Sequence, residues 1–318
     1  MKAKYIKGFL VLIWILNGCA SDHTQPFKPN DFPYLVILGV AQDAGYPQTG
    51  CYKEHCLRAW KNPELKRKVV SLGLVDPRTN KKWLFEATPD IKDQLYELNK
   101  LAPDSTYEFA GVFMTHGHMG HYTGLVQLGF ESMNIKNLNA YVMPRMEQYF
   151  RRNGPWSQLV DFKNIMLQPL EDSVMVSLTN DIAVVPFIVP HRDEYTEAVG
   201  FQIFANGRSV IFIPDIDKWY LWDINLSEIN ETWDYAFVDA SFYGDGELPG
   251  RDMSRVMHPF VSESFEYFDP LPDHKKAGVH FIHFNHTNPL LIDGSEAQKE
   301  VLEKGFNFAY EGQILELK

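Results

Sequence analysis

Three histidines within six residues are the clearest chemical feature of the sequence. His116, His118 and His121 lie in the stretch Met114-Thr-His-Gly-His-Met-Gly-His121, directly after the apolar run 109–114. That run is typical of a buried strand. In extended chain His116 and His118 point the same way, and His121 would follow from the first turn of a helix. Imidazole is a common zinc ligand, so the spacing predicts a metal site at a strand end.

The same stretch resembles the signature of the metallo-β-lactamase superfamily, Thr-His-x-His-x-Asp-His followed by a turn of small residues. One position departs, because Gly120 stands where the family has aspartate. In the family that aspartate binds the second metal and orients the attacking water. The departure predicts one tight zinc site and a second, weaker one. If both metals bound equally tightly, Asp43 or Asp90 would have to supply the missing carboxylate.

The resemblance also implies further ligands, which occur in the family's order. His191 closes the predicted strand 184–189, Asp215 follows the strand 209–213, and His283 ends the strand 279–283. Asp217 is a less favoured substitute for Asp215, and His280 is expected inside its strand. The implied first metal site is His116, His118 and His191 with an open position, as in catalytic zinc sites. The implied second site is His121, Asp215 and His283.

Cys51 and Cys56 allow two interpretations. In an exported protein two nearby cysteines can form a disulfide. Residues 40–51 and 86–90, however, resemble the branch that contains the PQQ-biosynthesis protein B family and the cyclic phosphodiesterase of phosphonate catabolism. In that branch a cysteine cluster binds a structural zinc together with a histidine of the last motif. The resemblance implies Cys51, Cys56 and His286, with His55 as fourth ligand because Lys53 stands where another cysteine is expected.

Two further segments are candidates for a substrate lip. Residues 239–246 and 257–259 combine glycines with polar and aromatic residues. In the related branch a histidine of this region faces the pocket, which makes His258 a candidate. Asp215 and His258 are therefore the predicted catalytic residues.

The N-terminus is predicted to be an export signal. Three lysines precede the apolar segment 8–16, which is too short to span a bilayer comfortably. Leu16-Asn-Gly-Cys19 resembles the bacterial lipoprotein cleavage box, so Cys19 would become the lipidated first residue, and the polar, Pro-rich residues 19–33 would be a tether. The alternative is an ordinary signal peptide or a membrane anchor with an incidental cysteine. If Cys19 is lipidated, we expect an exported bacterial lipoprotein anchored in the membrane, facing the periplasm or on the cell surface.

The charge disfavours a nucleic-acid substrate. The formal net charge is −11, and removal of residues 1–18, which carry three lysines and no acids, makes it −14. Basic residues cluster only in short runs such as 66–68 and 151–152, whereas binding to a polyanion depends on clustered Lys and Arg. We expect a small-molecule substrate, no nucleic-acid partner, and contact with a membrane only through the lipid anchor.

Strands and helices alternate along the rest of the chain, which predicts an α/β fold. Helices are expected at 90–101, 124–129, 144–152 and 295–304, and Asn206-Gly207 predicts a tight hairpin. Strands are expected at 34–40, 69–75, 83–87, 109–114, 138–143, 165–167, 174–178, 182–189, 198–204, 209–213, 235–238, 279–283 and 306–310. The resemblance implies the αββα four-layer sandwich of the metallo-β-lactamase type, as a single domain over residues 34–318.

The leading functional hypothesis is an exported metal-dependent hydrolase of a small ester, cyclic phosphodiester or amide. A metal lowers the pKa of its water to about 7, so metal-bound hydroxide would attack at neutral pH. A second hypothesis is iron-dependent oxidative chemistry in a role like that of PQQ-biosynthesis protein B, because His/Asp sites with open positions also suit iron. A third is a non-catalytic binding protein, motivated by Gly120.

Overall fold

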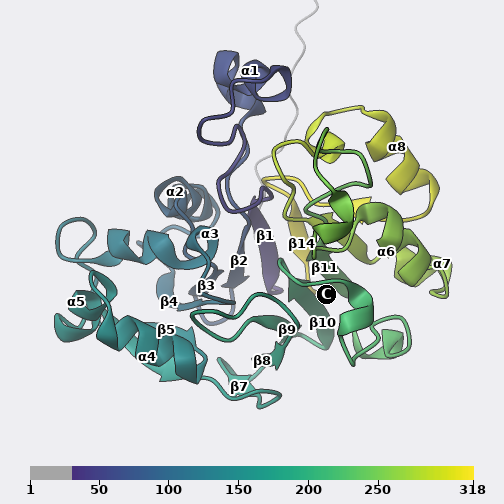
Figure 1. Cartoon of the computed structure of the whole chain (residues 1–318). Coiled ribbons are helices and arrows are strands. Elements are labelled where there is room, and N and C mark those ends of the chain that lie inside the picture. Colours follow the sequence, from purple (N-terminus) through teal and green to yellow (C-terminus); the bar gives the residue numbers. More distant parts are fainter. Residues whose placement is uncertain (1–30) are drawn as a thin grey trace, which may run out of the picture.

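Two seven-stranded β-sheets form the centre of the computed structural model, which describes residues 31–318 (Figure 1). The predicted signal segment, including Cys19, lies outside the described residues. The first sheet has the order β14 (Ile314–Glu316), β1 (Tyr34–Gly39), β2 (Ser71–Asp76), β3 (Lys81–Phe85), β4 (Glu108–Phe113), β5 (Leu138–Val142) and β6 (Ile165–Pro169). The second has the order β13 (Asn307–Phe308), β12 (Val279–Ile282), β11 (Tyr235–Asp239), β10 (Arg208–Ile213), β9 (Val199–Ala205), β8 (Ile182–Ile188) and β7 (Val176–Ser177).

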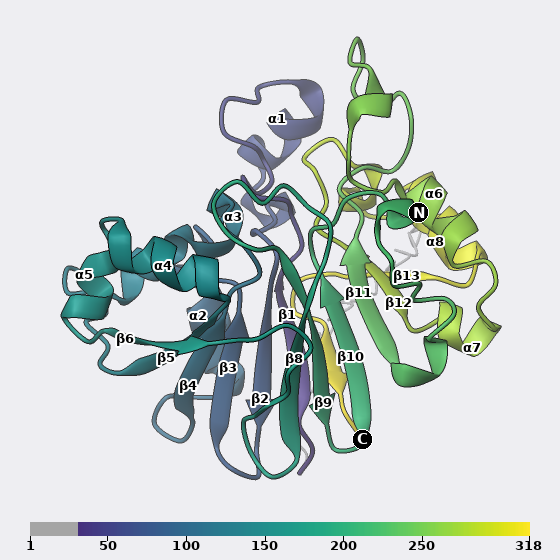
Figure 2. The same ribbon diagram turned by 60° about the horizontal axis from the view of Figure 1, so that its bottom comes forward.

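Helices cover the outer face of each sheet (Figure 2). On the first sheet lie α2 (Ile91–Leu101), α4 (Pro144–Arg152) and α5 (Trp156–Asp161), and beside the second lie α6 (Val261–Tyr267), α7 (Asp273–Lys276) and α8 (Glu296–Glu303). The short helices are α1 (Glu54–Lys61), α3 (Met119–Tyr122), and the 3₁₀ helices η1 (Pro63–Leu65), η2 (Thr123–Leu128), η3 (Trp219–Leu221), η4 (Asn230–Thr232), η5 (Met253–Arg255) and η6 (Pro289–Leu291). The layers are helix, sheet, sheet, helix, so the predicted four-layer sandwich is confirmed.

Aromatic side chains fill the space between the two sheets. The rings of Phe85 and Phe113 stack with centroids 4.8 Å apart, and Phe201 packs edge-on against both at 5.5 Å. A second apolar cluster lies between the first sheet and its helices, where Leu84 and Leu98 are fully buried. Strands β1 to β4 therefore contribute apolar side chains to both faces of the sheet, which explains their continuous apolar runs in the sequence.

Local signals predicted several elements well. The Asn206-Gly207 turn joins β9 and β10, and both residues have positive φ, 52° and 78°, as a type I′ turn requires. Ser295 caps α8 by accepting a hydrogen bond from the backbone of Gln298. The segment predicted as a helix at 124–129 is the 3₁₀ helix η2 instead.

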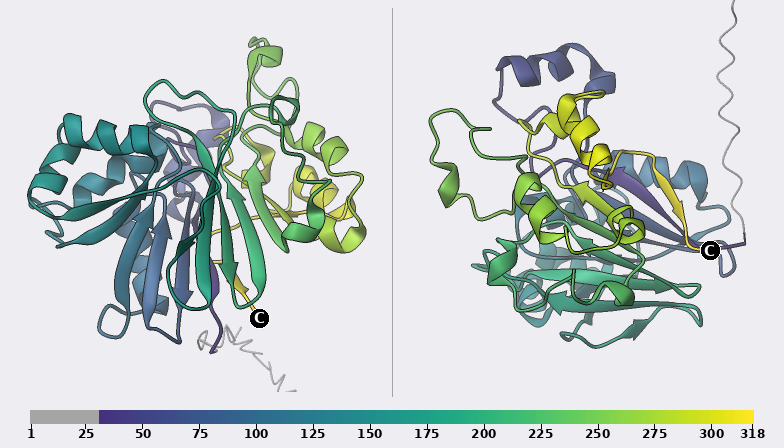
Figure 3. Two further views of the ribbon diagram at one scale, coloured as in Figure 1. Left: turned by 90° about the horizontal axis from the view of Figure 1, so that it is seen from below. Right: turned by 90° about the vertical axis from the view of Figure 1, so that its right-hand side faces the viewer.

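The two ends of the described chain lie side by side in the first sheet. Strand β14, which the sequence did not predict, pairs antiparallel with β1 through Tyr34–Glu316, Leu35–Leu315 and Val36–Ile314. Figure 3 shows the C-terminus next to the start of the described chain. A three-residue strand carries too little periodicity to be recognised without its partner. Within residues 31–318, no helix has the length and apolar character needed to cross a membrane.

Ten of the strands deliver their carboxyl ends to the same edge of the sandwich. In the first sheet β1, β3, β4, β5 and β6 run in one direction, and in the second β8, β10, β11, β12 and β13 do. Helix α1 and the loop between β11 and α6 rise from that edge (Figure 2). Ligands of open α/β sheets bind at the carboxyl ends of strands, so this edge is where a site is expected.

We predict that Phe85→Ala lowers the free energy of unfolding by about 3–5 kcal/mol, because it opens a cavity between the sheets. Urea unfolding followed by circular dichroism measures the change. Tyr220→Ala is the control, since that side chain is 81% exposed and its loss should change stability by less than about 0.5 kcal/mol. Equal effects of the two substitutions would contradict the assignment of the core.

Candidate metal centre

The predicted ligands meet at the edge where the strands end. His116 and His118 lie in the turn between β4 and α3, and His121 lies in α3. His191 follows β8, and Asp215 follows β10. His283 comes directly after β12. The structure therefore brings together all six residues proposed as metal ligands, from segments more than 160 residues apart in sequence.

Four of these residues form a compact first group. His116, His118, His191 and Asp215 offer ligand atoms that all lie within 4.8 Å of one another. His118 Nδ1 lies 2.9 Å from His116 Nε2 and 3.2 Å from His191 Nε2. Asp215 Oδ2 lies 3.4 Å from His116 Nε2 and 3.2 Å from His191 Nε2. Neighbouring ligands of tetrahedral zinc, at their usual bond lengths, stand about 3.3 Å apart, so the group fits such an ion.

A second group adjoins the first. Asp43, His121 and His283 offer ligand atoms within 4.8 Å of one another. Asp215 Oδ2 lies 3.7 Å from His121 Nε2 and 4.0 Å from His283 Nε2. Because the same oxygen faces both groups, Asp215 stands between them, as the resemblance implied for a bridging carboxylate.

Several ligand atoms of the second group are buried without a hydrogen-bond partner. Among the described residues this holds for Asp43 Oδ1, His121 Nε2 and His283 Nε2. A buried polar atom that lacks a partner costs about 1–3 kcal/mol, and more when it is charged. A cation coordinated by these atoms would remove that cost, so the residues present fit a metal.

Charge and burial favour the ligand forms of His116 and Asp215. Burial, together with His121, holds the pKa of His116 well below its ordinary value, so its imidazole is neutral. Burial alone would raise the pKa of Asp215, but His191, His258 and His283 outweigh burial and hold it well below the ordinary value. A neutral imidazole and an ionised carboxylate are the states that bind a metal.

Outer hydrogen bonds orient the histidines. Asp217 Oδ1 lies 3.1 Å from His191 Nδ1, Thr115 Oγ1 lies 2.9 Å from His116 Nδ1, and Ser241 Oγ lies 2.9 Å from His283 Nδ1. Such partners fix the ring and leave the other nitrogen for the ion. Asp217, which the sequence analysis treated as a substitute ligand, is placed as an orienting residue. His280 stays inside β12 as expected and stacks on Phe237.

Asp239 is a buried residue of the site that sequence reasoning missed. His258 Nδ1 lies 2.8 Å from Asp239 Oδ2 and 3.1 Å from Asp215 Oδ1. Burial would lower the pKa of His258, but Asp239 and Asp215 raise it well above the ordinary value. A signal was present, because Asp239 ends an apolar run as Asp215 nearly does, and β10 and β11 are parallel neighbours. From sequence, Asp239 was expected only as part of a substrate lip.

Glu86 is a second missed residue. It is fully buried after β3, has a positive φ of 75°, and its Oε1 lies 3.6 Å from His121 Nδ1. His283 is also fully buried with a positive φ, 68°. For residues other than glycine this backbone region costs roughly 1–3 kcal/mol, and such strain is concentrated at functional sites.

The cysteine cluster is a separate group near α1. Cys51, His55, Cys56 and His286 offer ligand atoms within 4.8 Å of one another, and Cys51 Sγ lies 3.3 Å from His55 Nε2. Both cysteines are buried free thiols, so the disulfide alternative is not formed. His55 joins the group because α1 begins at Glu54 and places His55 in its first turn. Two sulfurs and two imidazoles are a common donor set of structural zinc.

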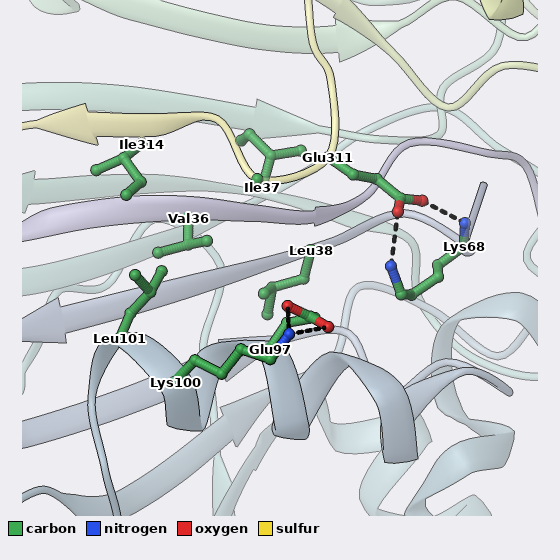
Figure 4. Close-up of a pocket in the computed structure, with 10 residues that line it drawn as sticks. Val36, Ile37, Leu38, Lys68, Glu97, Lys100, Leu101, Glu311 and Ile314 are labelled. Atoms are coloured by element: carbon green, nitrogen blue, oxygen red, sulfur yellow. Dashed lines mark hydrogen bonds and ion pairs between the residues drawn. The ribbon is translucent and has the colours of Figure 1, made fainter. Parts of the chain in front are cut away.

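A cavity of about 370 Å³ lies next to the first group. His191 and His258 line it together with Gln42 and Phe242. The charged residues of its wall are Asp217 and three arginines, Arg192, Arg251 and Arg255. A cavity of similar size, about 350 Å³, lies between β1, β14 and α2 (Figure 4). Its charged residues pair with each other, Lys68 with Glu311 and Lys100 with Glu97, and it contains none of the ligand groups. The cavity at the histidines is therefore the candidate substrate site.

Comparison with known proteins agrees with the fold. A family model described as the beta-lactamase superfamily domain matches residues 81–281. The coenzyme PQQ synthesis protein B of Pseudomonas putida is 24% identical over 315 residues, which covers 89% of this chain and all of that protein.

Two solved structures are similar over most of the chain. The zinc-bound PqqB from Methylobacterium extorquens has a TM-score of 0.75 at 22% identity, and the match covers 89% of this chain and all of that chain. A diphosphatase from the PhnP family has a TM-score of 0.64 at 19% identity, covering 90% of this chain and 97% of that chain. Both likenesses support the fold.

We predict that the His116→Ala/His118→Ala double variant binds one metal ion per chain fewer than the natural protein, because two of four donors of the first group are lost. Elemental analysis after dialysis against a defined free-metal concentration measures this. His274→Ala in α7 is the control, since His274 is exposed and outside every donor group. An unchanged metal content in the double variant would exclude the first group as a metal site.

Proposed function

The chain belongs to the β-lactamase superfamily, and on that premise we propose that it is a metal-dependent hydrolase of a small ester, cyclic phosphodiester or amide, with an anionic phosphodiester favoured. The observation that carries this proposal is the donor set of His116, His118, His191 and Asp215 beside a cavity with basic side chains. A bound zinc ion would polarise the scissile group and lower the pKa of a bound water.

The residues around the cavity divide the remaining work. Asp239 holds Nδ1 of His258, which leaves Nε2 of that ring for the cavity. His258 is placed to give the proton on Nε2 to the oxygen that leaves the substrate. Asp239 keeps the ring charged before that transfer, since it raises the pKa of His258. Asp217 holds the ring of His191 in place by its contact with Nδ1.

Three arginines support an anionic substrate. Arg192, Arg251 and Arg255 line the cavity of a protein whose net charge is −11. Arg192 pairs with Glu194 and Arg255 pairs with Asp252, whereas the guanidinium of Arg251 has no hydrogen bond or ion pair within residues 31–318. Guanidinium groups bind phosphate in a bidentate manner. The diphosphatase among the structural neighbours acts on a substrate of related chemistry.

The PQQ-related alternative has its own support. The coenzyme PQQ synthesis protein B of Pseudomonas putida matches nearly the whole chain. A role of that kind with iron-dependent oxidative chemistry would use the same histidines and Asp215, because such donors with open positions suit iron as well as zinc. The metal that restores activity to the metal-free protein separates the two functions.

We predict that the purified protein hydrolyses a p-nitrophenyl phosphodiester, that a chelator abolishes this activity, and that zinc restores it. The Arg251→Ala/Arg255→Ala variant should raise KM for the phosphodiester by about tenfold, which corresponds to the loss of about 1.4 kcal/mol of binding, with a smaller effect on kcat. Steady-state kinetics measure both constants.

Arg151→Ala is the matched control, since Arg151 pairs with Glu147 on α4 and lies outside the cavity. Neutral p-nitrophenyl acetate serves as the second substrate, and its hydrolysis should be nearly unaffected by the double substitution. Absence of chelator-sensitive hydrolysis of either ester would contradict the hydrolase proposal. Equal loss on both substrates would contradict the role of the arginines.

We also propose that the protein is an exported lipoprotein anchored through Cys19, on the basis of residues 1–33. We expect the mature protein to begin at Cys19 and its mass to include attached lipid. We also expect the protein to fractionate with membranes. Cys19→Ser should abolish the lipid mass and release the protein from membranes. Membrane fractionation and intact-mass measurement test this, and a Cys19→Ser variant that still partitions to membranes without lipid would contradict the anchor.

A further inference from the structure

Gly120 and Asp43 occupy one small volume beside His121. A Cβ atom built on Gly120 would lie 2.3 Å from Asp43 Oδ1, 2.4 Å from Asp43 Cα and 3.0 Å from Asp43 Cβ. Contacts this short are not formed between real atoms, so a side chain at position 120 and the present loop around Asp43 exclude each other. The space in which position 120 would carry a side chain is filled by Asp43.

The loop that carries Asp43 is held firmly next to the last histidine motif. Ala41 forms isolated bridges to Val69 and Phe284, and the backbone nitrogen of Gln42 donates to the carbonyl of Phe284 at 2.9 Å. Phe284 directly follows His283. Asp43 is thereby fixed between the strand end that supplies His283 and the helix α3 that supplies His121.

The donor atoms of this group point at one another. Asp43 Oδ1 lies 3.1 Å from His121 Nε2, and both His121 and His283 are fully buried. Asp43 Oδ1, His121 Nε2 and His283 Nε2 are all buried and lack a hydrogen-bond partner within the described part of the chain. Three buried ligand atoms that face one another and form no hydrogen bonds are the arrangement expected of a cation site. They are not the arrangement of side chains that satisfy one another by hydrogen bonding.

We propose that Asp43 is the carboxylate ligand of the second metal, with His121, His283 and the shared Asp215. This proposal rests on the metal centre of the proposed function, and it adds a ligand that comes from the loop after β1. Gly120 is then required by the close approach of Asp43 rather than being a missing ligand. Asp90, the other carboxylate considered from sequence, is excluded because its Oδ2 accepts a hydrogen bond from Val69 N and it lies outside the donor groups.

Glu86 lies on the other side of the same histidine. Its Oε1 is 3.6 Å from His121 Nδ1, while His121 Nε2 faces Asp43. A carboxylate behind a ligating imidazole holds the ring and strengthens its basicity. Glu86 is therefore a positioning residue for the second metal. Both of its carboxylate oxygens are buried without a hydrogen-bond partner, which agrees with that role.

This arrangement removes the basis for one expectation from sequence. The second metal was expected to bind weakly because no carboxylate stands at position 120. On that reasoning a Gly120→Asp substitution would tighten the second site. With Asp43 in place, the added side chain would collide with the backbone of residue 43. Substitution of Gly120 should displace the existing ligand and weaken the second site.

The test compares metal binding by the whole protein and its variants. Metal-free protein is titrated with cobalt(II), whose thiolate absorption reports separately on the cysteine cluster, and the bound metal is counted by elemental analysis. Asp43→Ala should bind one metal ion per chain fewer at a free-metal concentration that saturates the natural protein, with a loss of affinity of roughly 100-fold or more at that site. The thiolate absorption should be unchanged.

Asp293→Asn is the charge control, since Asp293 is exposed, faces Arg67 and belongs to no donor group. Gly120→Ala is the second variant, and it should weaken the same site without touching a ligand. Its control is Gly244→Ala, where the new Cβ would meet only Ser262 at 3.4 Å. Circular dichroism of each metal-free variant establishes that it is folded.

The outcomes separate the alternatives. If Asp43 only forms an ion pair with His121, Asp43→Ala keeps the full metal content with unchanged affinity, and the proposal is overturned. Full metal content with unchanged affinity in Gly120→Ala would also overturn the proposal. The close approach of Asp43 to position 120 would then have no effect on metal binding. Because metal is counted independently of turnover, a protein that binds both metals through Asp43 but hydrolyses no ester would refute the proposed function and leave this assignment intact.

Discussion

The burial of Asp215 is the constraint on which the site depends. Its carboxylate is 4% exposed, and its oxygens lie within 4.0 Å of imidazole nitrogens from His116, His121, His191, His258 and His283. A carboxylate at this depth is stable only if positive charge or aligned donors surround it. The ends of β4, β8 and β12, the short helix α3, and the loop between β11 and α6 supply those rings. The register of both sheets therefore serves to place imidazoles around a single buried anion.

Local sequence was enough for part of the site and insufficient for the rest. The spacing of His116, His118 and His121 is contained in one turn, so a single stretch of sequence predicted their convergence. The ends of β8, β10 and β12 were predicted because an apolar run stops at each of them, but His191, Asp215 and His283 were implied as ligands there by the family resemblance. Asp239 and Glu86 escaped because their roles arise from neighbours more than a dozen residues away in sequence. Nothing in the local pattern of Glu86 distinguishes a buried carboxylate behind an imidazole from an ordinary acid at a strand end.

The last histidine motif links the two donor clusters. His283 faces Asp215, and His286, three residues later, belongs to the cluster of Cys51, His55 and Cys56. The backbone at His283 has a positive φ, so it needs support from outside β12. A metal in the cysteine cluster would tie the segment after β12 to α1 and so stabilise that strained conformation. The same clamp would also steady the loop after β1, because that loop leads directly into Cys51.

Metal coordination depends on the positions of the ligand atoms. It does not depend on which segment of the chain supplies them. At 4 Å and an effective dielectric constant of about 20, one carboxylate contributes roughly 4 kcal/mol of attraction to a unit positive charge, before desolvation is subtracted. That attraction is the same whether the oxygen belongs to the turn after β4 or to the loop after β1. The difference lies in the backbone, because Asp43 approaches so closely that position 120 has room only for hydrogen. The glycine in the histidine motif and the aspartate 77 residues before it therefore form one structural feature, and neither can be interpreted without the other.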